Sequence, residues 1–185
     1  ESASTFDADT LINYEAGVKG RFFERRLDLE FSLYRIDWED LQVSVPIGPF
    51  GGIGNASEAK VKGAELSALL RPFTGTRLGF TAAYTDATLS EDDPSLGEEG
   101  TGLPFTPKWS WSLTAGQEFE LAGGWEANVG AGLRYVGSRR APFFLTPAVQ
   151  DLDGLKLPDY TLIDLTAGVS KANWEISIFA LNLTD

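Results

Sequence analysis

Hydrophobic and polar residues alternate with a period of two along most of this chain. In the stretch WEANVGAGLRYVG (125–137), Trp125 and Tyr135 share one face of an extended chain, while Glu126 and Arg134 share the other. One apolar and one polar side are typical of a β-strand. Seven further segments alternate in the same way: 11–20, 27–38, 62–70, 77–88, 109–119, 160–170 and 174–182. None shows a helical period, so the sequence predicts an all-β, antiparallel fold of about eight strands.

The segment 27–38 changes phase halfway along. Its bulky positions are Leu29 and Leu33 in the first half, but Tyr34 and Ile36 in the second. We interpret the change as the strand leaving the environment that set its first half, or as a β-bulge.

Short and long links alternate between the predicted strands. RFFERR, RPFTGT, ELAGG and KAN are short, whereas the links around 46–55, 89–107 and 139–158 are long. The short links therefore lie at one end of the sheet and the long links at the other. Outer-membrane β-barrels sort their turns and loops in this way, although soluble Greek-key folds do so in part.

Aromatic residues bracket the apolar face of several predicted strands. Trp125 and Tyr135 are ten residues apart, which spans about 25 Å along the axis of a tilted barrel strand. That length matches the lipid-facing band between two aromatic girdles, so the apolar side is predicted to face a membrane rather than a soluble β-core. The candidate girdle residues are Tyr84, Trp109, Phe119, Trp125, Tyr135 and Trp174.

The polar face is rich in small residues such as serine, threonine and glycine. An eight-stranded barrel must fill its interior with its own side chains, and these are too small for that task. The sequence therefore predicts a segment of a wider barrel. The charged residues of this face line a solute path or pair with another domain; the candidates are Glu15, Lys19, Glu65, Glu126 and Arg134.

The composition of the chain excludes several kinds of partner and reaction. The 185 residues include no Cys, His or Met and carry a net charge of −12. Nucleic acid is therefore not an expected partner, because phosphate binding needs a basic patch. No catalytic constellation, metal-ligand set or cofactor motif stands out, so we expect a non-enzyme that needs no cofactor or metal. No apolar run reaches the length of a transmembrane helix, and the missing initial Met indicates a mature or excised piece.

Two loop motifs contain charged side chains of the kinds that bind ions or charged ligands. SEDDPSLGEE (90–99) clusters carboxylates, but its spacing matches no calcium loop, which favours a solvated acidic segment. RRAPFF places Arg139 and Arg140 beside Phe143 and Phe144. These four residues are candidates to bind an anionic chelate or a lipopolysaccharide phosphate; a basic pair with loop-packing aromatics is the alternative.

Four stretches, in order, resemble the β-barrel of TonB-dependent outer-membrane receptors. They are NYEAGVKGRFFERRLDLEFSLYRIDWEDLQV (13–43), GNASEAKVKGAELSALLRP (54–72), LPFTPKWSWSL (103–113) and LPDYTLIDLTAGVSKANWEISIFALNLTD (157–185). The resemblance implies that residues 1–185 are part of an up-and-down transmembrane barrel of about 22 strands. It implies that the plug domain and the final strand lie outside this segment.

The same resemblance implies a bacterial outer-membrane receptor that takes up a scarce solute, most commonly a ferric siderophore. Its expected partners are the TonB complex, through the plug region, outer-membrane lipid and lipopolysaccharide, and a small ferric chelate. Two alternatives stay open: a passive porin or adhesin on a smaller barrel, and a soluble β-barrel or sandwich that binds an apolar ligand or glycan.

Overall fold

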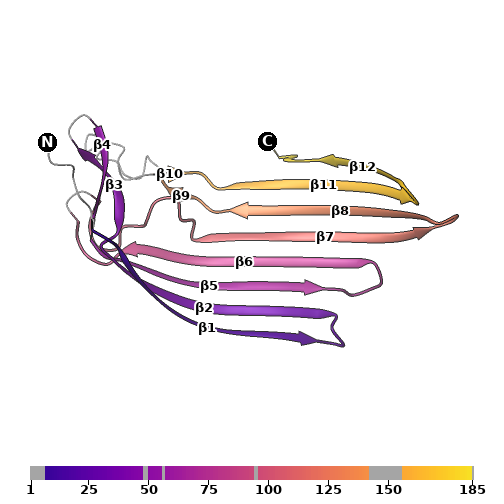
Figure 1. The fold of residues 1–185 in the computed structure, drawn as a ribbon, viewed down its shortest axis with the longest axis horizontal. Helices are drawn as coiled ribbons and strands as arrows, with labels where there is room; N and C mark the ends of the chain where they lie inside the picture. The colour runs from indigo at the N-terminus through magenta and orange to yellow at the C-terminus, as the bar shows by residue number, and fades with distance from the viewer. Residues whose placement is uncertain (1–6, 48–49, 56, 94–95, 142–155, 185) are drawn as a thin grey trace.

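A computed structural model describes residues 7–47, 50–55, 57–93, 96–141 and 156–184. Its main feature is one antiparallel sheet of eight strands in the order β1-β2-β5-β6-β7-β8-β11-β12. Their bounds are Thr10–Phe22, Leu27–Glu39, Ala59–Leu70, Thr76–Leu89, Trp109–Leu121, Trp125–Val136, Tyr160–Lys171 and Trp174–Ala180. Each long strand pairs with the long strands that precede and follow it in the chain, which confirms the predicted all-β, up-and-down arrangement (Figure 1).

Four short turns lie together at one end of the sheet, at the right of Figure 1, and we call this the turn end. The turns span 23–26, 71–75, 122–124 and 172–173. Gly123 and Gly124 both have positive φ, which is the left-handed backbone that a tight hairpin needs and glycine adopts without strain. The longer connections lie at the opposite end, the loop end, as the link lengths predicted.

The loop end contains two small hairpins that the alternation pattern did not predict. Strands β3 (Gln42–Ile47) and β4 (Phe50–Asn55) pair within the first long link, and β9 (Arg139–Arg140) pairs with β10 (Lys156–Leu157). Strand β4 is rich in glycine, with Gly51, Gly52 and Gly54. It nevertheless pairs with β3 along its backbone, although glycine weakens a strand interior.

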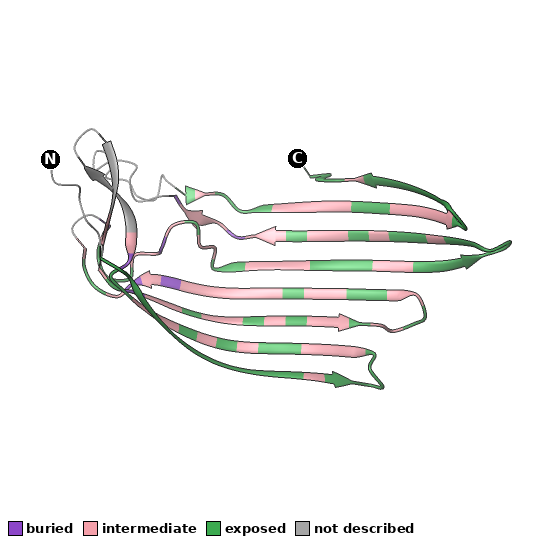
Figure 2. Cartoon of the chain, in the orientation of Figure 1, coloured by how far each residue is buried: buried purple, intermediate pink, exposed green. Residues whose placement is uncertain are grey.

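Each face of the large sheet keeps one character over most of its length. We call them the apolar face, which carries Leu33, Ala82 and Ala131, and the polar face, which carries Glu65 and Arg134. The apolar face is not buried: Trp174 is 73% exposed and Ile178 is 69% exposed. Apart from the segment packed on the polar face at the loop end, no second layer covers either face in the described part of the chain (Figure 2).

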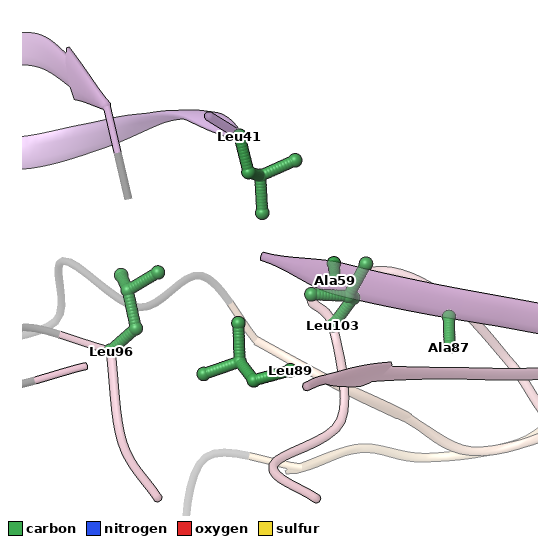
Figure 3. Packing of buried hydrophobic residues seen from close by; sticks show 6 residues of the cluster. All are labelled: Leu41, Ala59, Ala87, Leu89, Leu96 and Leu103. Atoms are coloured by element: carbon green, nitrogen blue, oxygen red, sulfur yellow. The ribbon is translucent and has the colours of Figure 1, made fainter. Parts of the chain in front are cut away.

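The hydrophobic core is one cluster at the loop end, formed by Leu41, Ala59, Ala87, Leu89, Leu96 and Leu103 (Figure 3). Trp38 and Val61 pack against it. Leu89 is 1% exposed, and the backbone NH of Leu103 donates to Ala87 O at 2.9 Å. The described residues of the connection 90–108 are thus held against the polar face at the loop end, where β2 and β6 end and β5 begins.

This cluster explains the change of phase in β2. The pairing of β2 with β1 and β5 runs without interruption from Leu27 to Trp38, so there is no bulge. Tyr34, Ile36 and Trp38 lie on the same face as Glu30 and Ser32. The polar face becomes apolar near the loop end because the connection 90–108 packs on it there.

Candidate functional site

A trough on the polar face crosses the middle of the sheet. It has a volume of about 600 Å³ and receives charged side chains from four strands: Glu15 of β1, Glu30 of β2, Glu65 of β5 and Arg134 of β8. Thr81 and Ser112 join hydroxyls across β6 and β7 at 2.7 Å within it. The trough is therefore hydrophilic and mainly acidic on one side, with a single arginine on the other.

Ion pairs hold the acidic side of the trough. Lys19 Nζ lies 2.8 Å from Glu30 Oε2, its cross-strand partner. Nearer the turn end, Asp28 accepts from Arg71 at 2.8 Å, and Arg21 lies 3.3 Å from the same carboxylate. Pairs as exposed as these contribute little to stability. Their effect is to set the positions of the charged side chains along the polar face.

A second hollow on the polar face lies at the turn end and contains Glu118, Glu120 and Glu126. Glu120 and Glu126 are directly opposed across β7 and β8. Like charges in that position repel. Arg77 offsets part of this charge through Glu118, with Nη1 2.7 Å from Oε1.

A basic pocket of about 330 Å³ opens at the loop end, beside the core cluster. Arg139 and Arg140 of β9 and Lys156 of β10 contribute to its wall, together with the hydroxyl residues Thr85, Thr106 and Ser138. Pairing of Arg140 with Lys156 brings the two cations together across a long link. Lys108, which pairs with Asp86 at 3.1 Å, is a fourth cation in the wall. Four cations in one pocket make an anion-binding arrangement in a chain of net charge −12.

Arg139 is the most informative residue of this pocket. Its guanidinium lies over the ring of Tyr160, with Cζ 5.5 Å from the ring centroid. Its Nη1 atom is buried and has no hydrogen-bond partner. A buried guanidinium nitrogen without an acceptor is costly, so an incoming oxyanion would recover that lost interaction.

The structure thus separates the predicted site residues into groups. Glu15, Glu65 and Arg134 share the trough, Lys19 flanks it through Glu30, and Glu126 lies in the turn-end hollow. Arg139 and Arg140 share the basic pocket, while Phe143 and Phe144 lie outside the described residues.

Sequence reasoning did not single out Glu30 and Lys156 as site residues. The alternation places Glu30 on the polar face, and counting from the turn 23–26 would have set it opposite Lys19. No local signal identifies Lys156, because its partner Arg140 lies across the long link.

The aromatic residues predicted to form girdles all lie on the apolar face. Tyr84 and Trp109 are cross-strand partners with ring centroids 4.9 Å apart near the loop end. Trp111 and Tyr135 stack at 5.7 Å in the same region. Toward the turn end lie Phe119, Trp125 and Trp174, and Lys171 Nζ lies 5.5 Å from the Trp125 ring.

Two further features bear on function. Among the described residues, no group of three or more Asp or Glu side chains is placed to hold a metal ion. No helix in the described residues is long and apolar enough to cross a membrane.

In the acidic connection, Asp93 accepts backbone NH groups from Ser57 and Leu96 at 3.0 and 3.1 Å, so this carboxylate shapes the connection.

Comparison with known proteins gives a consistent result. A family model described as "TonB dependent receptor-like, beta-barrel" matches residues 2–183. The metal-pseudopaline receptor CntO of Pseudomonas aeruginosa is 30% identical over 187 residues, which cover 100% of this chain and 25% of the relative. The ferrioxamine receptor of Yersinia enterocolitica is 31% identical over 123 residues, covering 66% of this chain and 15% of that receptor.

The fold comparison agrees. The ferric yersiniabactin uptake receptor FyuA from Yersinia pestis superimposes with a TM-score of 0.80 at 20% identity, covering 97% of this chain and 26% of that structure. This chain therefore spans about a quarter of the length of the full-length relatives. The resemblance inferred from the four sequence stretches is confirmed, as is the partial-barrel fold.

Proposed function

Because this chain belongs to the TonB-dependent receptor β-barrel family, we propose that it forms part of an outer-membrane receptor for energy-coupled uptake of a metal chelate of the ferric-siderophore class. The apolar face meets lipid, the polar face lines the lumen, and the loop end is extracellular. The barrel is completed by strands beyond this segment. Coupling to TonB runs through a plug domain elsewhere in the receptor.

The basic pocket is the observation that carries this proposal. It lies at the end proposed to be extracellular and contains the unpartnered Nη1 of Arg139. A metal chelate that presents carboxylate or other anionic oxygens supplies the missing acceptor. The trough with Glu65 and Arg134 then lies along the polar face, in line with passage through the lumen.

Exposure of the apolar face supports the membrane placement. Large apolar side chains such as Trp174 and Ile178 stay uncovered, whereas a soluble protein seldom exposes a continuous apolar surface of this extent. Lipid and lipopolysaccharide are therefore proposed partners of this face. Family membership favours a receptor over the porin, adhesin and soluble-binder alternatives.

Uptake by cells tests the proposal. The full-length receptor is expressed in a strain that lacks its own chelate receptors, and radiolabelled metal is supplied as metal-pseudopaline or as ferrioxamine, the ligands named for the two relatives. We expect accumulation of at least one chelate, abolished when TonB is deleted. Accumulation that continues without TonB would identify a passive channel, and no binding or uptake of either chelate would contradict this proposal.

A further inference from the structure

Among the described residues, the wall of the basic pocket contains cations but no carboxylate. Lys108 is offset by Asp86, which lies 3.1 Å away. Its other cations are Arg139, Arg140 and Lys156, and none of these three forms an ion pair with a described residue. The pocket therefore keeps the positive charge of two arginines and one lysine.

Two of these cations stand directly opposite each other. Arg140 on β9 is the cross-strand partner of Lys156 on β10, so the two side chains leave the same side of this small hairpin. Like charges at directly opposed positions repel each other and destabilise the pairing. An anion bound between them removes that repulsion, so the hairpin is more stable when the pocket is occupied by an anion.

Arg139 requires an anion for a separate reason. The ring of Tyr160 lies under its guanidinium, with Cζ 5.5 Å from the ring centroid, and the buried Nη1 has no hydrogen-bond partner. A guanidinium held on an aromatic ring keeps a fixed plane, so its N–H groups point in set directions. A planar carboxylate matches such a fork with two parallel hydrogen bonds.

The size of the pocket limits what can enter it. Its volume of about 330 Å³ lies near the lower end of the range of about 300–1,000 Å³ for sites that enclose a whole small ligand. A metal ion surrounded by its chelating groups needs more space than a single side arm. One arm of a chelate therefore enters the basic pocket, while the metal centre stays outside it.

The groups that chelate metals differ in charge when they are free of metal. A free carboxyl group is ionised at neutral pH, whereas a free phenol keeps its proton. A hydroxamate chelate uses its charged oxygens to bind the metal itself. An arm that reaches beyond the metal centre and still carries negative charge is therefore a carboxylate.

We propose, on the basis of the receptor function above, that the transported chelate carries a carboxylate arm that is not bound to metal, and that this arm enters the basic pocket. Arg139 donates two hydrogen bonds to the arm, and Arg140 and Lys156 balance further negative charge of the chelate. Tyr160 is a positioning residue that sets the plane of the Arg139 guanidinium. The substrates are thus anionic, carboxylate-bearing chelates, and chelates whose charged oxygens are all bound to metal are poorer ligands.

Two ferric chelates that differ in one arm test this inference. N-succinyl ferrioxamine B and N-acetyl ferrioxamine B share one metal centre, but only the succinyl form bears a free carboxylate. The Kd of each is measured for the full-length receptor in detergent. Because a charge-assisted hydrogen bond strengthens binding by roughly ten- to a hundredfold, we expect the succinyl form to bind more tightly by that factor.

Variants of Tyr160 test its positioning role. Tyr160→Leu removes the ring and should weaken binding of the succinyl form by about three- to thirtyfold, but should leave binding of the acetyl form unchanged. Tyr160→Phe keeps the ring and should bind both forms as the wild type does. Tyr14→Leu is the matched control, because it removes an exposed tyrosine ring from the apolar face of β1. Arg139→Lys keeps the charge without the planar fork and should also reduce the preference, which keeps the test valid if Tyr160→Leu folds poorly.

Equal affinity of the wild type for the succinyl and acetyl forms would overturn the inference. Equal weakening in Tyr160→Leu and Tyr14→Leu, or a failure of Tyr160→Phe to bind normally, would overturn the role of Tyr160. The proposed function is judged separately. Uptake of metal-pseudopaline or unmodified ferrioxamine without any preference for the succinyl form would keep the receptor function and reject the carboxylate arm. A receptor that binds none of these chelates would reject both.

Discussion

The ring of Tyr34 on β2 lies directly over Gly63 on the neighbouring strand β5, where a Cβ would collide with Tyr34 Cζ and Oη. From this position the Tyr34 hydroxyl reaches Thr85 Oγ1 on β6 at 3.1 Å. A glycine thus provides the space through which one aromatic side chain links three strands. The arrangement lies on the polar face, just below the core cluster.

Gly63→Ala should displace the Tyr34 ring and break its hydrogen bond to Thr85. We expect a loss of about 1–2 kcal/mol, the cost of one hydrogen bond and a displaced aromatic contact. The measurement is thermal unfolding of the full-length receptor in detergent. Gly132→Ala is the matched control, because a Cβ there meets only Asp164 Cβ at 3.9 Å. Equal shifts in the two variants would show that the Tyr34 contact contributes nothing.

Ala131→Arg tests which face meets lipid. Ala131 lies on the apolar face between Ala115 and Leu165, and arginine at the bilayer midplane costs roughly 2–4 kcal/mol. Gly132→Ser is the polar-face control; Gly130 is unsuitable because a Cβ there lies 2.6 Å from Thr166 Oγ1. Folding yield into lipid vesicles should fall only for the arginine variant. Similar yields for both would reject the membrane-facing assignment.

Leu89→Ala should release the connection 90–108 from the sheet. Leu89 is 1% exposed in the core cluster, and removal of a buried leucine side chain costs about 2–5 kcal/mol. Limited proteolysis should therefore cut within 90–108 faster in this variant. Leu113→Ala, on the apolar face where the side chain is 47% exposed, should leave that cleavage rate unchanged. Protection equal to wild type in Leu89→Ala would contradict a packed connection.

Arg139→Gln tests the basic pocket. Loss of a charge-assisted hydrogen bond costs about 1.5–3 kcal/mol, so the Kd for the transported chelate should rise by roughly ten- to a hundredfold. The measurement is titration of the full-length receptor with whichever of metal-pseudopaline or ferrioxamine it binds. Arg25→Gln, at the turn end, should bind normally. An unchanged Kd in Arg139→Gln would place ligand recognition outside this pocket.

Some of this molecule was predictable from local pattern. The period-two alternation identifies the eight long strands, and the link lengths separate a turn end from a loop end. Both are properties of consecutive residues, because a strand directs successive side chains to opposite faces wherever it lies. The same alternation assigns Glu65 and Arg134 to one face and Trp125 and Tyr135 to the other.

Contacts between strands were decided only by the tertiary structure. The Tyr34–Gly63 packing, the Lys19–Glu30 pair and the pairing of Arg140 with Lys156 each depend on the register that joins distant segments. The polar face also becomes apolar at the loop end because Leu96 and Leu103, which follow β6 in the chain, pack there against β5 and β6. The sequence by itself determined which way each side chain faces along its strand. Its neighbours were set by strand pairing and loop packing, because these depend on residues far apart in the chain.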